Sequence, residues 1–268
     1  MQDRITELAD AYRQARAELE FLDSNMWIGR PRNPEFATGF DIHALRDRLQ
    51  RYGIAGGLVS HFAVLTYDVE WANEQVLAET AGTGLSAVVT LTPEMFEPPE
   101  AGRAYLSGAI ARGARAARVF PATHNFTLRA WCSGALLQAL ADSRLPLIIW
   151  HTEASWDEIR NLCESYPEVP VIVEGTPKKI LYYGRQYYPL LGRCPNLRLE
   201  LHNLVSYLGV EDVVRRFGAR RLVFGTYMPV YDPNTALMQV THARLSSEDK
   251  RLIARDNLAE LMAGVKPL

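Results

Sequence analysis

Short apolar runs alternate with amphipathic stretches along the whole chain. Eight of these runs contain β-branched or aromatic residues and are bounded by turn or helix signals, which is typical of buried strands. Between them lie stretches such as 41–53 and 211–219, whose apolar spacing suits helices packed on a sheet. The pattern predicts strands near 19–23, 54–60, 85–91, 116–120, 146–151, 170–175, 197–202 and 221–226.

This strand–helix unit recurs about every 30 residues, as parallel strands joined by helical crossovers require. Eight such units predict the α/β class and a (β/α)8 TIM barrel. A doubly wound open sheet is the competing architecture, but it would carry a glycine-rich loop after its first strand, and "FLDSNMWIG" has none. We predict one domain over residues 1–268. Residues 3–18 form an extra N-terminal helix outside or across the barrel bottom, and residues 245–262 form a closing helix capped by Ser246 or Ser247.

Composition limits the partners. Hydrophobic residues make up 48% of the chain, charged residues 22%, and the net charge is −2. This balance supports a large core and gives no electrostatic reason to bind nucleic acid or an anionic membrane. Three scattered cysteines form no paired-thiol motif, the N-terminus lacks an apolar signal core, and the longest apolar run, "LPLIIW", is too short to span a bilayer. The expected localisation is cytoplasmic.

Five segments, taken in chain order, resemble the amidohydrolase-related branch of the amidohydrolase superfamily. "FLDSNMWIG" is similar to its first-strand motif Asp-x-His-x-His, and "LPLIIWHTEA" to its strand-5 segment, which ends in a ligand histidine. "CPNLRLELH" resembles the strand-7 opening, "RFGARRLVFGTYMP" the strand-8 motif Phe-Gly-Ser-Asp-x-Pro, and "ARDNLAELM" the closing helix. The resemblance covers nearly the whole chain. It implies metal-assisted hydrolysis, or decarboxylation in some members.

The resemblance also implies five metal ligands, of which this sequence keeps one. The first-strand histidines fall on Asn25 and Trp27, and the strand-5 histidine is kept as His151. The strand-6 histidine falls on Glu174 and the strand-8 aspartate on Tyr227. An indole has no lone pair to give, an amide is a weak ligand, and a phenol with a reference pKa of about 10 is neutral at pH 7. We therefore predict a degenerate metal site and a metal-independent protein without a cofactor.

The titratable side chains left at the strand ends are the catalytic candidates. His151 and Glu174 would transfer protons, Tyr227 would stabilise developing charge, and Asp23 is a further acid–base group. Glu174 would titrate near neutrality in an apolar pocket, and an ion pair that holds the barrel mouth together is the equal alternative. For Tyr227, the alternative is a packed ring. Glu153 is a candidate partner that orients His151.

Substrate-binding candidates lie around these groups. Arginine and lysine side chains would hold a substrate carboxylate, and the remaining candidates would line the pocket. The set is Asn25, Trp27, Arg30, Arg118, Lys178 and His202. In "EGTPKK", Thr176 as a cap and Pro177 as the first helical residue would expose backbone N–H groups beside the two lysines. Two solvated lysines are the alternative interpretation.

The leading hypothesis is a metal-independent hydrolase, or a lyase, that acts on a small carboxylate-bearing lactone, ester or amide. The first alternative is a non-catalytic barrel, a pseudoenzyme that binds a small molecule or a protein partner. The second alternative is a metal-dependent hydrolase or decarboxylase with a rebuilt site made of His151, Glu174 and His202. A homodimer is implied by the resemblance alone.

Overall fold

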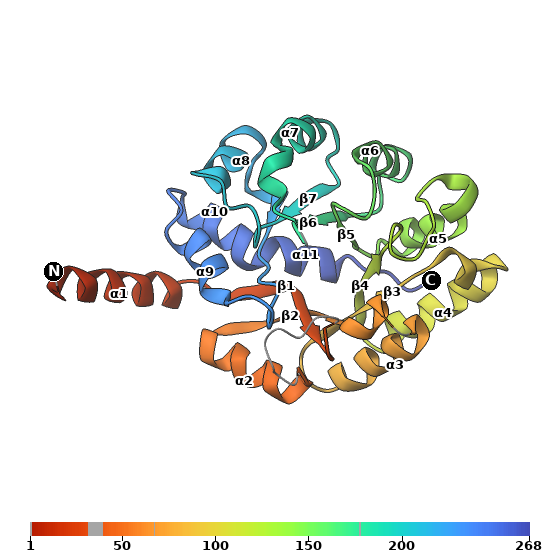
Figure 1. The fold of residues 1–268 in the computed structure, drawn as a ribbon, viewed down its shortest axis with the longest axis horizontal. Coiled ribbons are helices and arrows are strands. Elements are labelled where there is room, and N and C mark those ends of the chain that lie inside the picture. Colours follow the sequence, from red (N-terminus) through yellow and green to blue (C-terminus); the bar gives the residue numbers. More distant parts are fainter. Residues whose placement is uncertain (1, 32–39, 67, 177) are drawn as a thin grey trace.

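Eight parallel strands form one sheet in sequence order, with helices around it (Figure 1). The computed structural model describes residues 2–31, 40–66, 68–176 and 178–268. The predicted (β/α)8 TIM barrel is confirmed. Its strands are β1 (Phe21–Ile28), β2 (Ile54–His61), β3 (Ser86–Thr90), β4 (Ala114–Val119), β5 (Leu147–Trp150), β6 (Val171–Glu174), β7 (Leu197–Glu200) and β8 (Leu222–Val223).

The ends of the sheet meet between β1 and the segment after β8. Ser24 N donates to Phe224 O at 3.0 Å, and Trp27 N donates to Met228 O at 2.9 Å. Met26 and Met228 also form a parallel bridge. These pairings extend β1 to Ile28, whereas the sequence predicts its end at Asp23. The sequence also predicts a long loop over residues 24–40; residues 24–28 are strand instead, and residues 32–39 lie outside the described residues.

Helices alternate with the strands and bury one face against the barrel. Several begin at a side-chain cap, as α2 does at Asp41 and α6 at Ser155. The α-helices are α1 (Gln2–Ala17), α2 (Ile42–Tyr52), α3 (Val69–Thr80), α4 (Pro99–Ala111), α5 (Ala130–Ser143), α6 (Trp156–Ser165), α7 (Gly184–Arg193), α8 (Gly209–Phe217), α9 (Pro233–Thr241), α10 (Ser247–Arg251) and α11 (Asn257–Ala263). Short helical turns are η1 (Phe62–Leu65), η2 (Pro93–Phe96), η3 (Ile180–Tyr183), η4 (Ala219–Arg221) and the π-helical η5 (Leu252–Asp256).

The closing helix covers the barrel bottom. Leu258 and Leu261 of α11 pack against an apolar layer inside the barrel, made of Leu58, Val88, Ala116, Ile148, Ile172 and Val223. Ser246 caps α10 by accepting from Asp249 N, as one of the two predicted caps. Since α11 occupies the bottom, the N-terminal helix has no room there.

Helix α1 instead projects away from the barrel (Figure 1). Residues 3–11 are all exposed, and the helix is held near its C-terminal end by Tyr12, whose hydroxyl donates to Asn234 Oδ1 at 2.9 Å. The predicted helix is confirmed, and of its two predicted positions, outside the barrel or across its bottom, the structure has the first. None of the helices among the described residues combines the length and the apolar composition that crossing a bilayer demands.

Candidate functional site

A polar layer lies directly above the apolar one, at the carboxyl ends of the strands. Side chains on a strand alternate between its two faces, so the residue two positions after an inward apolar residue also points inward. This rule brings together Ser60, Thr90, Arg118, Trp150 and Glu174, and Glu200 joins them at the end of β7; all six are buried. Active sites of TIM barrels occupy this end.

Arg118 and Glu174 form a two-point ion pair across the barrel. Arg118 Nη1 donates to Glu174 Oε2 at 2.6 Å and Nη2 donates to Oε1 at 3.0 Å, with both side chains fully buried. Trp150 Nε1 donates to the same carboxylate at 3.0 Å. Burial raises the pKa of Glu174, and the Arg118 guanidinium opposes that rise. Glu174 is thus an internal partner of Arg118, which in turn is not free to bind a substrate carboxylate as predicted.

Aromatic rings fill the adjoining half of the mouth. Trp27 is fully buried, stacks on Phe62 at 4.6 Å between ring centroids, and lies 4.7 Å from the Arg118 guanidinium carbon. Phe120, Trp150 and Tyr227 complete this aromatic cluster. Burial raises the pKa of the Tyr227 phenol further above its usual range. Trp27 occupies a position that the resemblance gives to a metal ligand. Because these rings contact one another, that position holds a packed indole.

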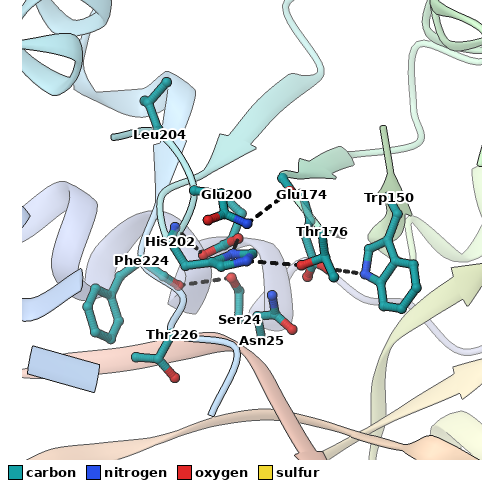
Figure 2. A network of polar contacts seen from close by, with 12 residues as sticks. Ser24, Asn25, Trp150, Glu174, Thr176, Glu200, His202, Leu204, Phe224 and Thr226 are labelled. Carbon is teal, nitrogen blue, oxygen red and sulfur yellow. Dashed lines mark hydrogen bonds and ion pairs between the residues drawn. The ribbon is translucent and has the colours of Figure 1, made fainter. Parts of the chain in front are cut away.

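The other half of the mouth holds a chain of three polar side chains (Figure 2). Glu200 accepts from His202 on two sides: Oε1 from the backbone N–H at 2.8 Å, and Oε2 from the ring Nδ1. His202 Nε2 meets Thr176 Oγ1 at 3.0 Å. Burial lowers the pKa of His202, but the carboxylates of Glu200, Glu174 and Asp23 together more than offset this, and the net pKa is raised. With its proton on Nδ1, the imidazole presents a basic Nε2 to the Thr176 hydroxyl.

Gly225 makes room for the Glu200 end of this chain. A Cβ placed on Gly225 would fall on the Glu200 carboxylate. The carboxylate therefore occupies the volume that any other residue at 225 would need for its side chain.

Asp23 joins the first strand to the segment after the last. Its Oδ1 accepts from Asn25 N at 2.9 Å and Thr226 N at 3.1 Å, and its Oδ2 accepts from Thr226 Oγ1 at 2.5 Å. Burial raises the pKa of Asp23 to about 7, with a further contribution from Glu200. A carboxyl group with this pKa exchanges its proton near neutrality. The sequence predicted that behaviour for Glu174, which lies in the same buried layer.

Asn25 has one atom without a partner. Its Oδ1 accepts from Trp27 Nε1 at 2.7 Å, whereas its Nδ2 is buried and makes no hydrogen bond. In Figure 2 the amide nitrogen is directed toward the side of the mouth that holds His202 and Thr176. A buried N–H donor left unpaired is unfavourable, so this atom is suited to bind an oxygen of a ligand.

The donor atoms here do not fit a metal ion. Asn25 Oδ1 and both Glu174 oxygens already accept hydrogen bonds, and Trp27 gives no lone pair. Across the part of the chain that the structure describes, no three His, Cys, Asp or Glu side chains are grouped to hold an ion. The alternative site of His151, Glu174 and His202 is not formed among these residues. Arg118 and Trp150 bind the Glu174 carboxylate, and the His151 ring lies against Tyr183 rather than beside His202.

His151 points away from the mouth. Trp150 faces inward, so the next residue faces the surrounding helices, where the His151 ring lies 4.8 Å from that of Tyr183 and 6.3 Å from that of Trp156. Burial lowers its pKa, and its Nε2 has no partner. Glu153 does not orient it, because the Glu153 carboxylate accepts from Thr123 N and Oγ1, at 2.9 Å each. The predicted pairing of His151 with Glu174 in proton transfer is not supported by this geometry.

The other predicted anion-binding groups lie outside the buried layer. Arg30 is exposed, and so are Lys178 and Lys179, which follow Thr176 closely in the chain. Thr176 does not cap a helix: its hydroxyl meets His202, and the next helical turn begins at Ile180. Pro177 lies outside the described residues.

Sequence reasoning missed Glu200 and the role of Thr176. The spacing Glu200-x-His202 at a strand end was the available signal, because residues two apart share a face of a strand. The contact with Thr176 joins neighbouring strands and depends on their register, for which the sequence offered no signal.

Comparison with known proteins bears on the fold. No family profile and no curated protein matches the sequence. Among solved structures, a proposed amidohydrolase from Staphylococcus aureus matches with a TM-score of 0.72 at 11% identity, over 91% of this chain and 100% of that one. The match shows that the two chains share the (β/α)8 fold.

Two further matches agree. A 2,6-dihydroxybenzoate decarboxylase from Rhizobium matches with a TM-score of 0.68 at 15% identity, over 91% of this chain and 99% of that one. A proposed 2-pyrone-4,6-dicarboxylic acid hydrolase from Pseudomonas putida matches with a TM-score of 0.67 at 14% identity, over 92% and 98%. The resemblance found in the sequence is confirmed at the level of fold.

Proposed function

We propose that this amidohydrolase-type barrel is a metal-independent hydrolase of small esters or lactones of organic acids. The observation that carries the proposal is the division of the barrel mouth. Where resemblance places metal ligands, the structure has an indole and a carboxylate bound to arginine. Beside them, buried acid–base groups with shifted pKa values remain, namely Asp23 and His202. Groups of this kind at a strand end are candidates for catalysis.

The organic acid is inferred from charge. Lys178 and Lys179 are exposed and follow Thr176 in the chain by two and three positions. They attract a carboxylate-bearing substrate toward the polar half of the mouth. The proposed 2-pyrone-4,6-dicarboxylic acid hydrolase of Pseudomonas putida, which shares the fold, bears a name with a substrate of this kind.

The test is a panel of small lactones, esters and amides, with and without carboxylates, assayed before and after treatment with a metal chelator. We expect turnover on carboxylate-bearing lactones or esters that the chelator leaves unchanged. Activity abolished by the chelator and restored by zinc or manganese would overturn metal independence. Turnover that Lys178→Ala and Lys179→Ala leave unaltered would overturn the preference for an acid, with Lys266→Ala, near the C-terminus, as the matched control.

The burial of the aromatic cluster favours a second candidate, a non-catalytic barrel that binds a small molecule. Trp27 is fully buried and Tyr227 is 9% exposed, so rings occupy much of the space that a substrate would need. Thermal-shift measurements with the same panel separate the two candidates. Stabilisation without turnover on any compound supports the binding protein.

A further inference from the structure

We propose that Thr176, His202 and Glu200 form a nucleophilic relay, with Asn25 as the donor to the substrate carbonyl oxygen. This inference rests on the proposed function and names the residues that would perform it on a small ester or lactone. The arrangement matches the carboxylate–imidazole–hydroxyl order that activates a nucleophile in unrelated hydrolases.

The contacts give each side chain one role. Glu200 holds His202 through both the backbone N–H and Nδ1, which fixes the ring and its tautomer. The opposite nitrogen, Nε2, is 3.0 Å from Thr176 Oγ1, within the reach of a base that takes a proton from a hydroxyl. Glu200 is a positioning residue, and His202 is the base.

The fourth group is identified by an unsatisfied atom. Asn25 Nδ2 is buried without a partner, while its Oδ1 is fixed by Trp27 Nε1 at 2.7 Å. The amide group therefore cannot flip without losing its hydrogen bond to Trp27. Its N–H groups stay directed toward the polar half of the mouth. A preorganised donor of this kind is worth most where negative charge develops. The indole at position 27 thus holds the amide that faces the substrate oxygen.

The reaction follows in two steps. Thr176 Oγ1 bonds to the carbonyl carbon as its proton passes to His202 Nε2, and the carbonyl electron pair moves onto the oxygen bound by Asn25 Nδ2. When the carbonyl re-forms, the bond to the leaving alkoxide breaks, and the alkoxide takes the proton from His202. Water then attacks the threonyl ester with His202 again as base, which releases the acid and restores the hydroxyl.

The experiment uses p-nitrophenyl acetate as an activated ester, with the full chain and variants of unchanged circular dichroism. We expect Thr176→Val to lower kcat at least about 100-fold, because the nucleophile is lost, and Thr176→Ser to retain activity within about tenfold. Thr152→Val is the matched control and should stay within about twofold. Asn25→Leu should lower kcat about 100-fold with little change in KM.

Mass spectrometry of the quenched reaction identifies the acylated residue. One acetyl group on the peptide that contains Thr176 supports the relay. Parent-level turnover by Thr176→Val would overturn the relay and leave the proposed hydrolase intact. An acetyl adduct on Thr176 without turnover would support the relay and contradict the hydrolase. Neither adduct nor turnover from the parent protein would contradict both.

Discussion

The two halves of the barrel mouth are both buried, but they differ in whether their polar atoms all have hydrogen-bond partners. In the aromatic half, every large side chain is packed against another ring, and the ion pair of Arg118 and Glu174 satisfies its own charges. In the polar half, His202 links the Glu200 carboxylate to the Thr176 hydroxyl, and Asn25 Nδ2 has no hydrogen-bond partner. Burial alone therefore does not distinguish structural from chemical roles, whereas unsatisfied and directional polar atoms do.

The largest expected effect tests the aromatic half. Trp27→Ala removes a fully buried ring from contact with Phe62 and Arg118, so it should lower the free energy of unfolding by about 4–5 kcal/mol. Urea denaturation measures the change. Trp131, which is 80% exposed, provides the control, since Trp131→Ala should change it by less than about 0.5 kcal/mol. Similar losses for both variants would contradict a structural role for the aromatic cluster.

The second effect tests the buried ion pair. Glu174→Leu leaves the Arg118 charge buried without a partner and should lower the free energy of unfolding by about 3–4 kcal/mol. The double variant Arg118→Met/Glu174→Leu should recover most of that loss, because no charge is then stranded. Asp142→Leu, at an exposed pair with Arg103, should lower it by less than about 1 kcal/mol. A double variant no more stable than the single one would show that packing, rather than charge, decides this position.

The third effect concerns pH. Because the pKa of Asp23 is raised to about 7 in the folded state from 3.8, the folded state holds a proton between these values that the unfolded state has lost. The stability from Asp23 is complete below pH 3.8 and is lost as pH rises through about 7, at up to about 1.4 kcal/mol per pH unit. The advantage of the parent protein over Asp23→Asn should therefore shrink from pH 5 to pH 7. Urea titrations across that range measure it, and Asp142→Asn serves as the control. An advantage that grows with pH would mean that Asp23 is ionised when folded.

The smallest expected effect sharpens the contrast between the halves. Thr176→Val removes one hydrogen bond to His202 and should lower the free energy of unfolding by only about 1 kcal/mol, despite its burial. Set beside the loss for Trp27→Ala, this value would place Thr176 among residues kept for chemistry. A loss above about 3 kcal/mol would place Thr176 among the structural contacts instead.

The barrel was predictable because its signals are local and repeated. Each strand reads as an apolar run between helices, and eight such units leave few alternatives. The end of β1 was not predictable, since residues 24–28 mix polar, aromatic and aliphatic side chains and pair with the segment after β8. The position of α1 was likewise not predictable, because it depends on α11, which lies at the other end of the chain and packs beneath the barrel.

The candidate site was predictable in position and only partly in membership. Asp23, Asn25, Glu174 and His202 do lie together in the buried mouth, as strand ends of a barrel should. The direction of His151 was missed because it depends on whether residue 150 or 151 faces inward, and a run such as "LIIW" is apolar on both faces. An ion pair of Glu174 was one of the two predicted interpretations and is found. That its partner is Arg118 was not predicted, because the two residues are 56 positions apart in the chain.

The close approach of Glu200 to Gly225 has a consequence for how the relay can be probed. A methyl group added at 225 would push the carboxylate away from His202, although Thr176, His202 and Glu200 themselves were unchanged. Gly225→Ala would therefore impair the relay by misaligning Glu200, although the substituted residue takes no part in the reaction.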